Sequence, residues 1–170
     1  KPIQDINLDN LRSQTGCVPQ EVFLFSDSIA NNISFGTFGN ESKNNQQSIE
    51  WAAKQASVHG NIKSFEAGYD TLVGERGVTL SGGQKQRVSI ARAILKNPSI
   101  LIFDDCLSAV DTETEETILN NLKDIMANKT TIIVSHRISG IKHADHIIMI
   151  DAGKIIEEGN HHELVGKDGE

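Results

Sequence analysis

The stretch 80–105, LSGGQKQRVSIARAILKNPSILIFDD, decides the fold of this chain. Its first half carries apolar residues at the spacing of one helix face, and Asn97-Pro98 ends that helix. Ile100–Phe103 is an uninterrupted apolar run that leads into Asp104-Asp105. Such a run is typical of a strand buried on both faces of a parallel sheet. A helix followed at once by this strand predicts an α/β unit. The apolar helix face consists of Val88, Ala91, Ile94 and Leu95.

Two further apolar segments extend this pattern on either side. Thr15-Gly16-Cys17-Val18 runs into Pro19-Gln20 and predicts a strand followed by a loop. Thr130–Val134 predicts the next strand, which ends in Ser135-His136. The alternation of strands with helices predicts an α/β fold built on a parallel sheet.

The other segments are predicted from periodicity and turn residues. A loop is expected over Asn31–Ser48, where Asn, Ser and Gly dominate. Thr112 and Glu115 have capping-box spacing and predict a helix through about Ala127. The remaining expected elements are a helix from Ile49 to Val58, an irregular stretch over Glu66–Thr79, a β pair over His146–Ile150 and Lys154–Glu157, and a short helix over His162–Val165.

Composition excludes several classes of protein. The 170 residues, 38% apolar and 23% charged, suit a globular core and exclude a disordered tail or a collagen-like fibre. A net charge of −7 argues against broad binding to nucleic acid or to an anionic membrane. No apolar run approaches the roughly 18 residues that span a bilayer. Two cysteines without a CxxC pair suit a reducing compartment, so the chain by itself is predicted to be cytosolic.

Polar residues follow two predicted core strands. Asp104 and Asp105 come at the end of one strand and His136 at the end of the next. Ligands of open α/β sheets bind beyond the carboxyl ends of the strands, so these three side chains are expected to face one site. Carboxylate oxygens suit Mg²⁺. The alternative is that the two aspartates only end a strand and begin a turn.

The turn Ser81-Gly82-Gly83-Gln84 lies at the start of the predicted helix. Free backbone N–H groups and the positive end of the helix dipole favour an anion there. The two glycines remove side chains that would keep a phosphate from the backbone. The alternative is a simple helix cap.

In this order, the motifs resemble the nucleotide-binding domain of ATP-binding cassette (ABC) transporters over nearly the whole chain. Leu80–Gln84 is similar to the family signature, and Ile100–Asp105 to its Walker B strand. Ser108–Asp111 is similar to the D-loop. Gln20 matches the Q-loop glutamine and His136 the switch histidine. The resemblance implies a P-loop NTPase (RecA-like) core, partial here, with a helical subdomain.

Two further segments resemble the exporter branch of the family more than the importers. They are Val73–Gly77, before the signature, and Ser135–Arg137. The implied function is therefore ATP-driven export across a membrane, with ATP and Mg²⁺ as cofactors.

The resemblance implies roles for four residues around the metal and the attacking water. Asp104 would hold Mg²⁺, directly or through water, and Asp105 would stand at the catalytic carboxylate position. Gln20 would touch the metal and the attacking water and couple them to the membrane domain. His136 would contact the γ-phosphate.

It also implies a dimer. Ser81, Gly82 and Gly83, with Gln84 of the same signature, would cradle the γ-phosphate of ATP bound to the opposite subunit. Asp111 would lie across the dimer interface. The expected partners are a second nucleotide-binding domain and a transmembrane domain, with no nucleic acid and no other membrane contact. The expected location is the cytoplasmic side of the cell's inner membrane.

Asp105 departs from the family pattern, because most active members carry Glu at this position. The missing methylene retracts the carboxylate by roughly 1.5 Å, and misplacements of that size can cost about 100-fold in rate. We therefore predict a weakly hydrolytic site on this subunit, which would complete the site of a different partner subunit.

A second departure is that no G-x-x-x-x-G-K-[ST] motif occurs in the sequence. We expect a C-terminal part of the domain, laid out as residues 1–20 (core strand and Q-loop), 21–96 (helical subdomain) and 97–170 (RecA-like core). By itself this part is expected to bind ATP feebly and to be inactive. The strands ending near Gln20, Asp105 and His136 are expected to be neighbours, separated by a missing strand from the one around Ile148.

Two other functions compete with the exporter interpretation. One is a soluble ABC-type ATPase that acts on ribosomes or DNA, although the chain lacks the basic or coiled-coil insertions of such proteins. The other is a non-catalytic interaction module, which Asp105 and the absent phosphate-binding motif favour.

Overall fold

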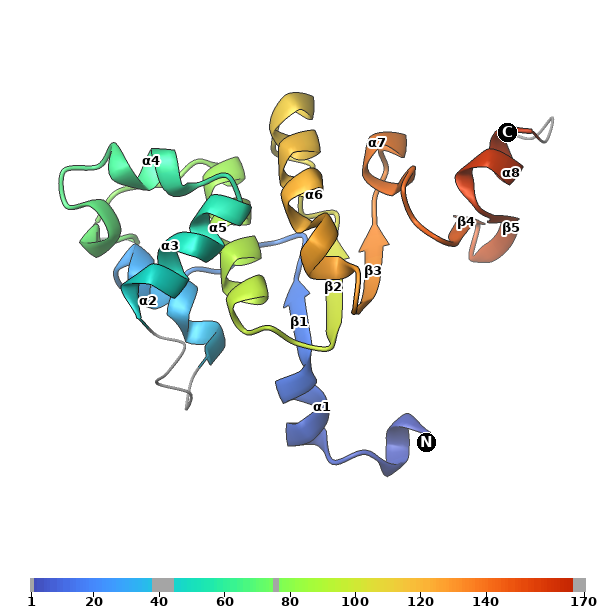
Figure 1. Cartoon of the computed structure of the whole chain (residues 1–170), viewed down its shortest axis with the longest axis horizontal. Helices are drawn as coiled ribbons and strands as arrows, with labels where there is room; N and C mark the ends of the chain where they lie inside the picture. The colour runs from blue at the N-terminus through green and yellow to red at the C-terminus, as the bar shows by residue number, and fades with distance from the viewer. Residues whose placement is uncertain (1, 38–44, 75–76, 167–170) are drawn as a thin grey trace. The chain divides into compact units, whose positions relative to one another are not determined.

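The computed structural model describes residues 2–37, 45–74 and 77–166, which form two compact units, Lys1–Val134 and Ser135–Glu170 (Figure 1). Of the segment Val73–Gly77, residues 75 and 76 lie outside the described residues, as do 38–44 of the expected loop. No helix in the described ranges has the length and apolar character needed to cross a membrane.

A parallel three-stranded sheet lies at the centre of the first unit, in the order β1-β2-β3 (Figure 1). In the register, Val18 pairs with Phe103, and Asp104 pairs with Val134. The three strands predicted to be neighbours are therefore neighbours, and their carboxyl ends share one edge. The strands are β1 (Thr15–Val18), β2 (Ile100–Asp104) and β3 (Thr130–Val134).

Helices surround this sheet and supply most of the core. Helix α5 (Gly82–Leu95) contributes eight buried residues and packs against β1, α2 and α3. Ile118 and Leu122 of α6 join the same core. The other elements of the unit are η1 (Ile3–Asp5), α1 (Leu8–Gln14), α2 (Ile29–Ser34), η2 (Phe35–Thr37), α3 (Gln46–Gln55), α4 (His59–Lys63), η4 (Gly68–Asp70) and α6 (Thr112–Met126).

Three local predictions are wrong. Residues 31–37 are helical in α2 and η2, because Ser28 caps α2 and buried Asn32 uses its side-chain amide on backbone partners. Helix α6 is capped by Asp111, one residue before the predicted cap Thr112. Strand β2 buries only Leu101 and Phe103, whereas Ile100 and Ile102 are half-buried and Asp104 is exposed.

The second unit contains the predicted β pair. Strands β4 (Ile147–Asp151) and β5 (Lys154–Gly159) are antiparallel. Ala152 and Gly153, with φ of 46° and 75°, form the two-residue connection, as expected for a turn that matches the strand twist. Helices α7 (Ile138–Ile141) and α8 (His161–Val165) complete the unit, and α8 confirms the predicted C-terminal helix.

Candidate functional site

Gln20, Asp104 and Asp105 meet at the carboxyl ends of β1 and β2, and we call this group the carboxylate edge. The Gln20 amide nitrogen lies 3.4 Å from Oδ2 of Asp105, a long hydrogen bond. Asp104 and Gln20 are exposed. The parallel pairing of β1 with β2 thus brings together residues 85 positions apart in the chain.

The backbone of Asp105 has the left-handed conformation, with φ of 44°. Aspartate tolerates this conformation better than most residues. Its N–H donates to the carbonyl of Val134 at 2.9 Å, and its own carbonyl accepts from Oγ of Ser108 at 2.8 Å. The backbone of Asp105 is therefore tied on both sides, whereas among the described residues its carboxylate has the one long bond from Gln20.

His136 lies in the second unit, two residues after the last residue of β3, and is exposed. Its placement beside Asp104 and Asp105 stays a prediction.

The turn before α5 is a complete helix cap. Oγ of Ser81 accepts from the N–H of Gln84 at 3.2 Å, and Oε1 of Gln84 accepts from the N–H of Ser81 at 2.9 Å. The helix cap left open as an alternative is thus present. The Gln84 carboxamide oxygen is engaged within the turn, whereas Ser81 and Gly82 are exposed.

This turn is in contact with the loop Ser108–Asp111. A Cβ atom on Gly83 would lie 2.8 Å from the Ala109 carbonyl oxygen, so only glycine allows this approach. Oε1 of buried Gln86 accepts from the N–H of Ala109 at 3.2 Å. We call the turn 81–83, Gln86 and the loop 108–111 the signature junction.

Asp111 ends the signature junction as the cap of α6. Its carboxylate accepts from the N–H of Thr114 at 2.9 Å and from the Thr114 hydroxyl at 2.7 Å. These bonds, with a smaller attraction from Arg87, lower the pKa of Asp111 below its ordinary value. Asp111 is therefore held as an anion at the start of α6.

Behind the carboxylate edge, Asn32 and Arg92 hold the segment that follows Gln20. Asn32 is 1% exposed, and its side chain accepts from the N–H of Phe25 at 2.8 Å and donates to the Phe25 carbonyl at 3.0 Å. The Arg92 guanidinium donates to the carbonyls of Asn32, at 2.7 Å, and Phe23, at 3.1 Å. Burial lowers the pKa of Arg92. The segment is therefore anchored three to five residues beyond Gln20.

The carboxylate edge is suited to a hard cation with few protein ligands. No three His, Cys, Asp or Glu side chains among the described residues could hold a metal ion together. Magnesium is commonly bound by one or two carboxylates, with phosphate oxygens and water as the other ligands. Asp104 and the Gln20 carbonyl oxygen offer such a partial set, so the residues fit the Mg²⁺·ATP that the resemblance implies.

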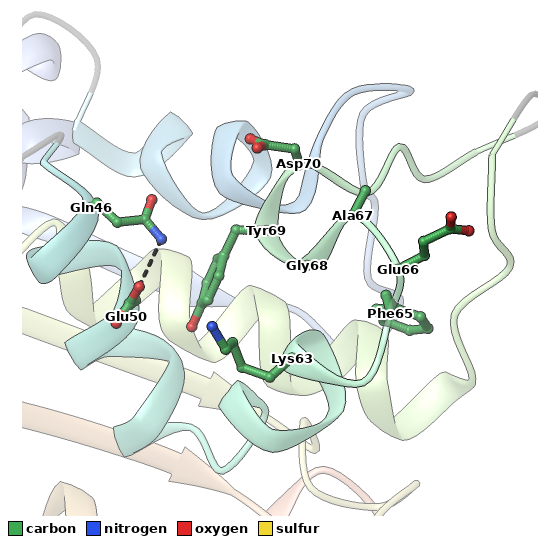
Figure 2. A pocket seen from close by; sticks show the side chains of 9 residues that line it. All are labelled: Gln46, Glu50, Lys63, Phe65, Glu66, Ala67, Gly68, Tyr69 and Asp70. Carbon is green, nitrogen blue, oxygen red and sulfur yellow. Dashed lines mark hydrogen bonds between the residues drawn. The ribbon is translucent and has the colours of Figure 1, made fainter.

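A separate hollow of about 370 Å³ lies between α3, the end of α4 and η4, and Figure 2 shows its lining. Its floor includes Tyr69, whose hydroxyl lies 2.8 Å from Nδ1 of His59, and its rim includes Glu50, which accepts from the Gln46 amide at 2.8 Å. Burial, with a smaller effect of Glu50, raises the pKa of Tyr69 to about 12. None of the predicted site residues lines this hollow.

The sequence interpretation did not single out Gln86, Asn32 or Arg92. A signal for Gln86 was present, because it precedes Ile90 and Ile94 by four and eight residues and so lies on an apolar helix face. Asn32 had no such signal, since amide-rich segments usually indicate loops.

Comparison with known proteins agrees with the geometry. A family model described as ABC transporter matches residues 1–108. The chain is 53% identical over 169 residues to the uncharacterized ABC transporter ATP-binding protein YknU of Bacillus subtilis. It is 46% identical over 169 residues to the ATP-dependent lipid A-core flippase of Hahella chejuensis. Each match covers 99% of this chain and 28% of the relative.

The fold is also that of a solved relative, a bacterial Atm1-family ABC exporter with ATP bound. The TM-score is 0.88 at 42% identity, over 98% of this chain and 28% of that one. The predicted α/β ABC ATPase fold is thus confirmed, and this chain spans 28% of the length of these relatives. Because the family model matches well over half of its residues, the chain belongs to the ABC transporter family.

Proposed function

We propose that this chain is part of the ATP-hydrolysing motor of an ABC exporter, on the cytoplasmic side of the inner membrane. The observation that carries the proposal is the carboxylate edge, where neighbouring parallel strands bring Gln20 and Asp105 within 3.4 Å. The names of the relatives, a lipid A-core flippase and an Atm1-family exporter, support export over the two rival functions.

In this proposal Asp104 and Gln20 hold the magnesium ion of Mg²⁺·ATP. The ion would neutralise phosphate charge and polarise the γ-phosphate when bound. Gln20 also orients Asp105, since its amide N–H donates to that carboxylate. Asp105 accepts a proton from the attacking water, and His136 contacts the γ-phosphate.

The signature junction serves a second subunit. The backbone N–H groups of Gly82 and Gly83 begin α5, where the dipole of a 14-residue helix favours an anion, and the Ser81 hydroxyl lies in the same turn, whereas the Ser81 N–H donates to Gln84. They would hold the γ-phosphate of ATP on the opposite nucleotide-binding domain, with Gln84 holding the turn in shape. The Asp111 anion would lie at the interface between the two domains.

Asp105 makes this subunit's own site a slow one. Its carboxylate ends one methylene short of a glutamate, so an attacking water is held less well. The other subunit of the dimer would supply the faster site, which makes a dimer of two different subunits the expected assembly. The transmembrane domain of the transporter is the second partner.

The experiment is ATP turnover by the intact protein in lipid vesicles, before and after Asp105→Glu. We expect the rate at this subunit's own site to rise by about 100-fold, the cost of a misplacement near this size. Total turnover is expected to rise by less, because the other subunit's faster site already contributes to it. Asp105→Asn is the matched control and is expected to give no rise in turnover. Its side chain is no longer than that of aspartate, and its carboxamide cannot accept a proton from the attacking water.

Three results would contradict the proposal. Unchanged turnover in Asp105→Glu would refute the slow site. The absence of turnover in both proteins would favour the interaction module. Turnover that requires added ribosomes or DNA would favour the soluble ATPase.

A further inference from the structure

Gln86 is a buried polar side chain on the apolar face of α5. It is 6% exposed, and Ile90 and Ile94, one and two turns further along, are buried with it. A buried carboxamide is expected to have hydrogen-bond partners, because an unpaired polar group in a core is costly. The partner of Gln86 therefore indicates why glutamine stands here.

That partner lies 23 residues away in the chain, in the loop that follows β2. Oε1 of Gln86 accepts from the backbone N–H of Ala109 at 3.2 Å. The bond lies one turn of helix from Gly83, whose missing side chain allows the carbonyl of the same Ala109 to approach. Arg87, the next residue of α5, attracts the Asp111 carboxylate at the end of the loop. Two positions of the loop, Ala109 and Asp111, thus meet the first turns of α5.

The same loop is also bonded to the carboxylate edge. Ser108 donates from its hydroxyl and its N–H to the Asp105 carbonyl, at 2.8 and 3.3 Å. Ala109 is the next residue. A shift of the loop at Ala109 therefore acts on both the turn before α5 and the backbone of Asp105.

We propose that Gln86 is a positioning residue, which holds the loop 108–111 against the turn 81–83 so that the two keep one relative position during the ATPase cycle. This inference rests on the proposed function, in which the turn and the loop both serve a dimer interface. Gln86 acts through Ala109 and touches neither nucleotide nor metal. Its side-chain oxygen accepts from the loop and so ties the two segments.

The test is Gln86→Met in the intact protein, because Met fills a similar volume without an acceptor. Two quantities are measured: hydrogen exchange at the Ala109 amide, and steady-state ATP turnover. We expect the Ala109 amide to lose its protection. We also expect kcat to fall by about 10-fold with little change in KM, because sub-ångström to ångström misplacements act on the rate rather than on nucleotide binding by other residues.

Two matched variants separate positioning from stability. Gln86→Glu keeps an accepting oxygen at the same reach, in either protonation state, so Ala109 protection and turnover are expected to stay near those of the unmodified protein. Ile90→Val removes one methylene from a fully buried site in the same helix. It is expected to lower the unfolding temperature while Ala109 protection and kcat stay unchanged.

The results that would overturn the inference are distinct from those that bear on the proposed function. Full turnover in Gln86→Met, or an equal loss of turnover in Ile90→Val, would refute positioning. An Ala109 amide that stays protected in Gln86→Met would refute the bond itself. An unmodified protein that hydrolyses no ATP, yet protects Ala109, would refute the proposed function on which the positioning role depends.

Discussion

The signature junction and the carboxylate edge differ in how firmly they are held. The junction has a complete helix cap, a backbone approach that only glycine allows, and a buried glutamine bonded to a loop amide. Within the part of the chain that the structure describes, the carboxylate of Asp105 has one long bond, from an exposed glutamine. The part that we propose to serve a partner is thus more firmly held than the part that we propose to act on this subunit's own nucleotide.

This difference matches the proposed division of labour between two subunits. A surface that must fit a phosphate held elsewhere gains from being formed in advance, because ordering it on binding would cost affinity. In the same proposal, a carboxylate that assists only slow hydrolysis of ATP is under no such demand.

The largest effect on stability is expected from Asn32→Ala, on the side of the carboxylate edge. The change removes the acceptor of the Phe25 N–H and one donor to the Phe25 carbonyl, which keeps its bond from the N–H of Asp27, and it removes one acceptor of Arg92. We expect a loss of about 3 kcal/mol in the free energy of unfolding, measured by urea denaturation. Turnover is expected to fall as well, because the segment after Gln20 loses its anchor.

The neighbouring Asn31→Ala is the matched control. Asn31 is exposed and donates to Asp27 at 2.9 Å. A surface change of this kind is expected to cost no more than about 0.5 kcal/mol. Equal losses in the two variants would show that Asn32 is not an anchor.

The signature junction is tested by a pair of adjacent glycines. In Gly83→Ala the new Cβ would lie 2.8 Å from the Ala109 carbonyl oxygen, so the loop must move, and we expect a loss of about 2 kcal/mol. In Gly82→Ala the new Cβ would meet only the Ala109 Cβ, at 3.7 Å, an ordinary contact. That variant is expected to change the unfolding free energy by no more than about 0.5 kcal/mol.

Thermal unfolding of both variants is the measurement. If Gly83→Ala proved as stable as Gly82→Ala, the close approach at the junction would be refuted, and the contrast with the carboxylate edge would largely disappear.

The smallest expected effect is a dependence of the unfolding free energy on pH, caused by the carboxyl group of Asp111. Its pKa is lower in the folded chain, so the folded state binds the proton less readily than the unfolded state does. The stabilisation is present above the ordinary aspartate pKa of about 3.9 and is lost as pH falls below it, through the lower folded value. Acid unfolding of the protein and of Asp111→Asn, followed by circular dichroism, measures this contribution.

Asparagine also caps helices, so Asp111→Asn is expected to keep α6 while flattening the acid limb of the stability curve. An unchanged acid limb would show that the Thr114 bonds do not stabilise the anion.

The sequence predicted the central elements because local and long-range signals agree there. In α5 and β2, helix periodicity, a proline after the helix and an apolar strand all indicate the same structure, and the parallel order of β1, β2 and β3 followed from the family resemblance. Gln20 and Asp105 were placed together for the same reason. The dimer and the position of His136 stay predictions.

The wrong predictions arose where tertiary contacts reverse a local preference. Asn32 belongs to a residue type that favours loops, yet it is buried in α2 because Phe25 and Arg92 satisfy its amide. Thr112 and Glu115 have capping-box spacing, but the cap of the helix is Asp111, whose carboxylate accepts from the N–H of Thr114. The side chain of Glu115 is buried in the core. Gln86 was missed because the partner of a buried polar residue cannot be read from helix periodicity.

Helix α5 links the signature junction to the segment that follows Gln20. Its 14 residues span about 21 Å at the ordinary rise of an α-helix. Its first turns hold the loop after Asp105 through Gln86, and its last turns hold the segment after Gln20 through Arg92. The helix therefore connects the loop after Asp105, at its first turns, to the segment after Gln20, at its last turns. If a phosphate bound at the turn 81–83 tilted α5, the segment that carries Phe23 and Phe25 would move at the other end of the helix. The helix itself would not need to change its internal structure.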